Sequence, residues 1–299
     1  MNKLRLWYNT AVQSAWLGWQ LESNWAEPWI FFIVCVIRPL SMLLIIVFMY
    51  YFATGGQQAA TQPSAMASAT AAGGDLFAFF FVGNILYLYV YNILFGVSQV
   101  IFEDREHYEV IKYIYISPVN WYIYFVGRGL ARFIIASISV VVSFLFGYFV
   151  FAMKISVPAA SIPTLVASTL MGILSIFFLG IIVSAFTFVM ARHGNTISES
   201  ISGIFYILCG TVFPIQTLPA WLRGLGVNIP VSYWFEITRR LLFNVDHTVD
   251  SVWHGQATAD LLYRQCVATV VLCIASIAIF NFMSALARAK GIVDRTTSY

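Results

Sequence analysis

Long apolar stretches alternate with short polar segments along this chain, and this pattern predicts its helices. A helix that crosses the hydrocarbon core of a bilayer needs about 20 mainly apolar residues. Such stretches occur at residues 29–52, 76–101, 121–151, 162–190, 197–213 and 261–287. The fifth is the shortest and ends at Phe213-Pro214, where proline cannot continue a helix. Because lipid cannot satisfy a free backbone, we expect an all-α membrane protein with six transmembrane helices.

The first 28 residues follow a different pattern. Apolar residues recur there at helical spacing, and polar residues fall elsewhere on the helical wheel. The apolar positions are Leu4, Tyr8, Val12, Ala15, Trp16 and Trp19. This pattern predicts an amphipathic helix on the membrane surface with its tryptophans at headgroup depth, the alternative being an ordinary packed helix. The chain thus divides into an interfacial helix, 1–28, and a six-span domain, 29–299.

Composition agrees with a membrane protein and limits the classes of partner. The chain is 60% hydrophobic and 10% charged, whereas soluble domains carry about 25% charged residues. Its net charge of +3 gives no reason to expect nucleic acid. The four cysteines lie in apolar runs without a CxxC, so we expect them to be buried apolar residues rather than metal ligands.

The distribution of Lys and Arg predicts the orientation. Six spans place both termini on one side, and with the termini inside, eleven of the 16 Lys and Arg fall in inner segments or the first span. The positive-inside rule then favours a multi-pass protein of the cytoplasmic membrane with both termini in the cytoplasm.

The densest charge lies in FEDREHYEVIKYIYISP, residues 102–118, between the second and third predicted spans. Three acids precede its apolar part, where carboxylates suit a helix N-terminus. Apolar residues at three- and four-residue spacing follow, and Ser117-Pro118 ends the helix. A short amphipathic helix with charge at one end suits docking to a soluble partner. The alternative is a loop that only obeys the positive-inside tendency.

Two motifs resemble those of the type-2 ABC exporter permeases. The EDRE stretch at 103–106, followed by Ile114, Ile116 and Ser117-Pro118, is similar to the family's coupling helix, which docks on the ATPase subunit. A Gly-Thr pair common in the family is replaced here by Glu109-Val110 or residues nearby. The resemblance implies ATPase-docking roles for these residues: Glu103, Asp104, Arg105, Glu106, Ile114, Ser117 and Pro118.

The second motif comprises GTVFP (210–214), LPAWL (218–222) and NIPVSY (228–233), followed by an acid and arginines at 236–240. In the family this segment forms a re-entrant helical hairpin near the external surface. Broken helices are tolerated at membrane depth where protein covers them or they line a cavity. The residues expected to form an external gate are Phe213, Pro214, Leu218, Pro219 and Trp221.

The resemblance also implies the partners. These 299 residues contain no GxxxxGK[ST], so they hold no P-loop for ATP. We therefore expect a transport subunit that is not itself an enzyme and binds no cofactor. Two copies of a separate P-loop ATPase would hold ATP and Mg²⁺, and a second permease, identical or a close paralogue, would complete the transporter.

Polar residues within the spans indicate a path for the cargo. One face of the second span carries Asn84, Tyr87, Tyr91, Phe95 and Ser98 at spacings of three or four residues. We expect this face to line the translocation path at a dimer interface, the alternative being hydrogen bonds between helices.

Arg38 is the other unusual residue, because it lies roughly 13 Å along the first span at 1.5 Å per residue. It either snorkels to the cytoplasmic headgroups or attracts an anionic cargo head at the inner entrance.

The resemblance implies an exporter, and we expect its cargo to be an amphipathic compound, drug-like or lipid-linked. A lipid-linked polysaccharide exporter is the alternative within the class. An ion-coupled secondary transporter would need ionisable residues at the midplane or inverted repeats. Acidic and histidine residues at 246, 247, 250 and 254 suit a solvated loop, so we expect no metal site.

Overall fold

The computed structural model describes residues 3–24, 27–53, 74–117, 119–151, 157–190, 194–243, 252–253 and 255–291. Within these ranges the chain is helical, with short turns and no strand. The prediction of an all-α protein is therefore confirmed for the described part of the chain. Pro118 and the acidic and histidine residues between 246 and 254 lie outside it.

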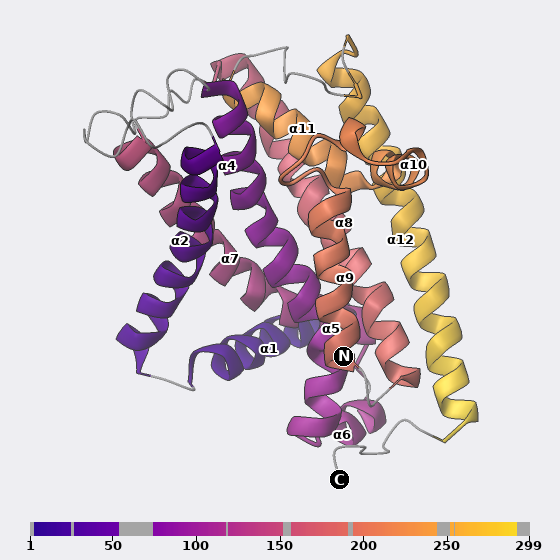
Figure 1. Cartoon of the computed structure of the whole chain (residues 1–299). Helices are drawn as coiled ribbons and strands as arrows, with labels where there is room; N and C mark the ends of the chain where they lie inside the picture. Colours follow the sequence, from indigo (N-terminus) through magenta and orange to yellow (C-terminus); the bar gives the residue numbers. More distant parts are fainter. Residues whose placement is uncertain are drawn as a thin grey trace.

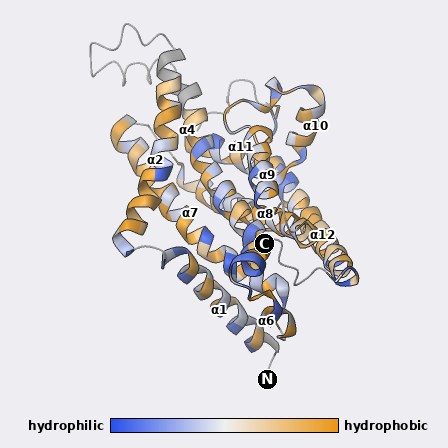
Figure 2. Cartoon of the chain, turned by 60° about the horizontal axis from the view of Figure 1, so that its bottom comes forward, coloured by the Kyte–Doolittle hydropathy of each residue, from blue (hydrophilic) through white to orange (hydrophobic). Residues whose placement is uncertain are grey.

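Five segments are long and apolar enough to cross a membrane among the residues described. They are α2 (Pro28–Ala53), the continuous segment α4 (Gly74–Tyr89), η1 (Val90–Leu94) and α5 (Phe95–Phe102), α7 (Trp121–Phe151), α8 (Ile162–Val189) and α12 (Thr258–Ala289). They match the first four predicted spans and the sixth. Figure 2 colours α2 and α7 as mostly hydrophobic.

The predicted fifth span, 197–213, is instead the shorter helix α9 (Gly194–Leu208). Its 15 residues extend about 22 Å, less than the ~30 Å of a hydrocarbon core. The helix ends before Phe213 because Gly210 adopts a positive φ of 67°, a conformation that commonly terminates helices. The turn continues into η5 (Ile215–Thr217), α10 (Ala220–Asn228) and α11 (Pro230–Phe243).

The segment α4–η1–α5 is the central one. In its most apolar window 72% of the residues are buried, against 17% for α12. The main core contains Val90, Val97, Phe125, Ile176, Trp234 and Phe235. Polar groups on the central segment are therefore surrounded by protein, whereas α12 presents most of its surface outward.

The helix α1 (Lys3–Ser23) packs across α7 through small residues. A Cβ at Gly127 would overlap the Ser14 hydroxyl, and one at Gly18 would lie 3.1 Å from the Cβ of Ala131. The predicted apolar stripe of α1 lies elsewhere on the helix, and Tyr8 and Trp16 are 69% and 58% exposed. That stripe remains available to a membrane surface.

The helices α1 and α6 (Ile111–Ile116) lie at the same end of the molecule as the last turn of α12 (Figure 1). The helix α10 and the first turn of α12 lie at the opposite end. The helices α1 and α6 and the end of α12 therefore lie together, away from α10.

Candidate functional site

The charged segment predicted for docking is a single π-helical turn, η2 (Glu103–His107), that extends α5. Asp104 and Arg105 are each only 1% exposed. The Tyr124 hydroxyl donates to Asp104 Oδ2 at 2.7 Å, and Arg128 contacts Glu103 at 2.9 Å and Asp104 at 3.6 Å. Tyr124 and Arg128 both belong to α7, so these acids anchor the end of α5 to α7.

Arg105 makes a second anchor, to the end of α8. Its guanidinium donates to the backbone carbonyls of Thr187 at 3.2 Å and Phe188 at 3.4 Å, and it pairs with Glu106 at 3.1 Å. The last carbonyls of a helix lack partners within the helix and carry its negative dipole end, so a cation satisfies them well.

Arg132 extends this cluster to α1. Its guanidinium pairs with Glu22 of α1 and lies 3.5 Å from Glu103. A Cβ at position 96 would clash with the Arg132 side chain, so Gly96 of α5 gives it room to pass. Burial raises the pKa of Glu22, while the neighbouring Arg132 lowers it. Charged contacts therefore connect α1, α7 and the end of α5.

The exposed surface at this end is formed by α6 instead. Tyr113 and Ile116 are 62% and 80% exposed, and Lys112 is exposed beside them. Ile111 is fully buried and fixes the helix to the core. Glu109 adopts a positive φ of 51° in the turn before α6. The docking role of the acids stays a prediction, but their side chains point inward and the free face belongs to Tyr113 and Ile116.

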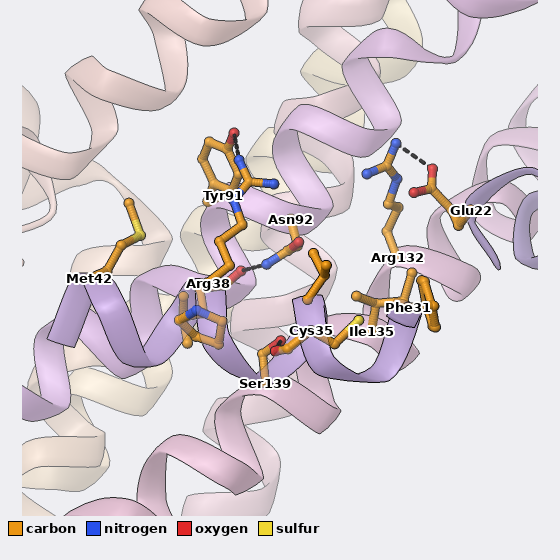
Figure 3. A pocket seen from close by; sticks show the side chains of 13 residues that line it. Glu22, Phe31, Cys35, Arg38, Met42, Tyr91, Asn92, Arg132, Ile135 and Ser139 are labelled. Atoms are coloured by element: carbon orange, nitrogen blue, oxygen red, sulfur yellow. Dashed lines mark hydrogen bonds and ion pairs between the residues drawn. The ribbon is translucent and has the colours of Figure 1, made fainter. Parts of the chain in front are cut away.

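A cavity of about 140 Å³ lies between α1, α2, the α4–η1 junction and α7. Figure 3 shows Arg38 reaching toward Tyr91 on one side of it and the Glu22–Arg132 pair on the other. Its lining mixes charged, polar and apolar side chains.

Two helix irregularities meet at this cavity. Pro39 lies inside α2 and has no N–H, so the carbonyl of Cys35 loses its usual helical partner. That carbonyl accepts a hydrogen bond from Ser139 of α7 at 3.0 Å. On the opposite wall Tyr91 and Asn92 lie in the π-helical turn η1. Such turns inside α-helices are frequent at functional sites.

Arg38 is an exposed cation within an apolar spanning helix. It donates to the Tyr91 hydroxyl at 3.0 Å, and its guanidinium carbon lies 5.4 Å from the ring centre. Among the described residues no carboxylate lies within ion-pair distance of it. A cation near the centre of a spanning helix costs about 2.5–3.5 kcal/mol on insertion scales, so this position demands a functional or structural explanation.

The predicted path face of the second span divides into two parts. Tyr87 donates to the Ser202 carbonyl at 2.7 Å, and Tyr206 donates to Asn84 at 2.8 Å, so both bond to α9. Ser98 is fully buried and bonds within its own helix. Tyr91 alone of the five lines the cavity, with Phe95 stacked on it at 5.6 Å. Within one chain Asn84 and Tyr87 therefore form hydrogen bonds to a neighbouring helix. The role of this face as a translocation path stays a prediction.

Comparison with known proteins agrees with this arrangement. A family model described as "ABC-2 type transporter" matches residues 14–243. The chain belongs to the ABC-2 type transporter family. This family is a membrane component of ABC systems and implies an ATP-binding partner subunit. Several apolar helices and this membership together make the chain a multi-pass membrane permease.

Two relatives of this ABC-2 permease are proteins named "Probable multidrug ABC transporter permease YbhR", from Escherichia coli strain K12 and from Escherichia coli O157:H7. Each is 20% identical over 170 residues. The match covers 55% of this chain and 43% of each relative, so it spans less than half of the relatives' own length.

The predicted gate residues of this ABC-2 permease lie at the end opposite α6. Phe213 and Trp221 are 58% and 71% exposed, whereas Leu218 is half-buried. Pro214 precedes η5 and Pro219 precedes α10, so each proline marks a helix start. Their role as a gate stays a prediction.

The residue that fixes this turn is Arg239 of α11, which the second motif included without a predicted role. It is 3% exposed, donates to the carbonyls of Gly210 at 2.9 Å and Thr211 at 3.1 Å, and lies 3.6 Å over the Phe79 ring. Its place in the motif was visible in the sequence, but its contacts with the turn were not, because they depend on how α11 packs against α4.

Proposed function

We propose that this chain is the permease subunit of an ATP-driven exporter that moves an amphipathic compound out across the cytoplasmic membrane. Two permease copies, identical or paralogous, work with two separate ATPases, which carry ATP and Mg²⁺. Both termini face the cytoplasm, so α1 and α6 lie on the ATPase side.

The observation that carries this proposal is the exposed face of α6, backed by buried charged anchors. Tyr113 and Ile116 offer an apolar contact to a soluble partner. In η2, the turn that precedes α6 in the chain, Arg105 contacts the end of α8, and Glu103 and Asp104 contact α7. Movement of an ATPase against α6 would therefore act on two spanning helices, shifting the permease between inward- and outward-open states.

The cavity supports a small amphipathic cargo. Its volume of about 140 Å³ and its mixed lining suit a headgroup with part of an apolar chain. The relatives' name, a probable multidrug ABC transporter permease, agrees with that class. A lipid-linked polysaccharide requires a long path continuous through the dimer. An ion-coupled transporter requires titratable groups at the midplane, and Arg38 alone is no proton relay.

The external half of the path remains part of the proposal. We propose that α9 and the turn after it complete a sixth crossing, and that cargo leaves past a re-entrant element formed by α10 and α11. Phe213 and Trp221 would then form the external gate, and Tyr91 and Phe95 would line the inner path.

Purification of the complex from its native membrane tests the proposal. The wild-type chain, extracted in mild detergent, should carry a P-loop ATPase whose activity responds to the permease. The double variant Tyr113→Ser with Ile116→Ser should lose it, because an apolar docking face is removed. Leu225→Ser, which alters a residue 57% exposed at the opposite end, is the matched control.

Absence of any ATPase from the wild-type preparation would overturn the exporter. Retention of an active, permease-responsive ATPase by the α6 double variant would overturn the docking face alone. Alanine at Glu103 or Asp104 makes a poor test, because these side chains hold α5 to α7.

A further inference from the structure

The cavity beside Arg38 has a net positive lining. Its charged residues are Arg38, Arg132 and Glu22. Arg132 pairs with Glu22, whereas Arg38 is bonded to a neutral phenol among the described residues. The charge that the cavity offers to a ligand is therefore that of Arg38, on the wall opposite the ion pair (Figure 3).

Hydrogen-bond donors converge at the same point. Arg38 has five N–H donors, and its hydrogen bond to Tyr91 uses one of them. Tyr91 accepts that bond with its oxygen, so its own proton is left to donate. A guanidinium and a phenol side by side suit a phosphate, sulfate or carboxylate, which accepts several bonds at once.

The remaining lining is mainly apolar, with Asn92 and Ser139 as its other polar members. Val34 and Met42 of α2 line the cavity and are 39% and 48% exposed, and Leu88 of α4 closes its inner wall. Of the most apolar window of α2 only 24% is buried, so Val34 and Met42 belong to a helix whose surface is mostly exposed in this chain. We expect a molecule in the bilayer to reach the cavity past this helix.

We propose that this cavity binds the anionic headgroup of a single-chain amphiphile, with Arg38 as its charge partner, Tyr91 as a second donor and the chain lying against Val34, Met42 and Leu88. The proposal deepens the exporter proposal, on which it rests, by giving the cargo a charge. The two irregular helix turns, at Pro39 and η1, shape the space that the headgroup occupies.

Photo-crosslinking of the full chain in phosphatidylcholine nanodiscs tests this inference. The probe is a dodecyl phosphate that carries a photoreactive group on its chain. Labelled peptides should come from α2 and from the α4–η1 segment. Unlabelled dodecyl phosphate should compete, and dodecyltrimethylammonium, matched in chain length, should not.

Variants assign the charge partner. Arg38→Gln should weaken labelling at least about tenfold, as expected for the loss of a charged hydrogen bond. Arg38→Lys should retain part of it, and Arg288→Gln, which alters an exposed cation on α12, should leave it unchanged. Met42→Trp should block labelling by filling the cavity without changing any charge. If Arg38→Gln fails to fold, Met42→Trp and the cationic competitor still decide the result.

Equal competition by the cationic and anionic amphiphiles, or full labelling of a folded Arg38→Gln, would overturn the inference. Adding phosphatidylglycerol to the nanodiscs distinguishes the sources of the headgroup. If it displaces the probe, a bilayer lipid is the occupant, and if it does not, the site prefers a cargo-like amphiphile. The measurement needs no ATPase, so the site can stand even if the exporter proposal fails.

Discussion

Arg105 is buried at the junction of α5, η2 and α8, and its side chain is fully inaccessible. Replacing it by methionine keeps most of the volume but removes the charged partner of two α8 carbonyls and of Glu106. Breaking a buried charge pair in this way lowers the free energy of unfolding by about 3–5 kcal/mol. We expect Arg105→Met to lower the free energy of unfolding by about 3 kcal/mol, measured by denaturant unfolding in detergent with tryptophan fluorescence.

Arg288→Met provides the comparison for this residue. Arg288 is exposed on α12 and donates a hydrogen bond to the Ser284 carbonyl of its own helix. Exposed substitutions usually change stability by less than about 0.5 kcal/mol. Equal unfolding midpoints for the two variants would show that Arg105 does not hold α8 to η2.

The same segment shows what residue chemistry alone could predict. The EDRE charges drew attention to this segment, because so much charge is rare in this chain. The direction in which these side chains point was not predictable, since their partners Tyr124, Arg128 and Thr187 lie 20 to 82 residues away in the sequence. Arg38 could be identified from the sequence because a cation within an apolar stretch is unusual. Its contact with Tyr91 could not, because that contact depends on how α2 packs.

At the scale of elements, the contact between α1 and α7 depends on the absence of a side chain at Gly127. A glycine within a helix is normally less favourable than alanine by about 1 kcal/mol. At Gly127 the added methyl group would meet Ser14 and the carbonyl of Ala11, whereas at Gly203 of α9 it would meet nothing within 4 Å. We therefore expect the two substitutions to change the free energy of unfolding in opposite directions. Gly203→Ala should raise it, and Gly127→Ala should lower it by about 1–3 kcal/mol because the contact becomes overpacked.

Stabilisation by both substitutions would show that α1 yields easily and is not firmly held on α7. A loss for both would point to a requirement for flexible helices rather than for close packing. The same denaturation measurement, made in one detergent, gives both values.

The helices α8 and α12 are joined by a different device, a reciprocal pair of hydrogen bonds. Ser168 donates to Gln265 Oε1, and Gln265 donates to the Ser168 carbonyl, each at 2.8 Å. Hydrogen bonds between membrane helices contribute about 0.6 kcal/mol on average. A double-mutant cycle with Ser168→Ala and Gln265→Leu should therefore give a coupling energy of about 0.6 kcal/mol. This is far below the change in the free energy of unfolding that we expect for Arg105→Met. A coupling energy as large as that effect would contradict this ranking.

Apolar length predicted five spanning segments well because burial in lipid depends on composition and length. It misplaced the end of the helix expected at 197–213, because the stop at Gly210 is set by a backbone conformation and not by hydrophobicity. The π-helical turns η1 and η2 were equally invisible, since each depends on how the central segment packs among its neighbours.

The short α9 raises a question for the whole molecule. The helices α8 and α12 both run toward the end where α6 lies, so the chain between them must return to the opposite end (Figure 1). The helix α9 provides about 22 Å of the ~30 Å required. The turn after Leu208, held by Arg239, and the helix α10 must supply the rest if the bilayer keeps its usual thickness.

Labelling of single cysteines determines whether this return is a true crossing. The background replaces Cys35, Cys209, Cys266 and Cys273 by serine or alanine. Gly224→Cys on α10, where a Cβ meets nothing within 4 Å, should react with a membrane-impermeant maleimide on intact cells. Lys112→Cys on the exposed face of α6 should react only after the membrane is opened. Protection of both positions in intact cells would place α10 in the cytoplasm, contradict the positive-inside assignment and remove the external gate from the proposed mechanism, because α9 would then not cross the bilayer.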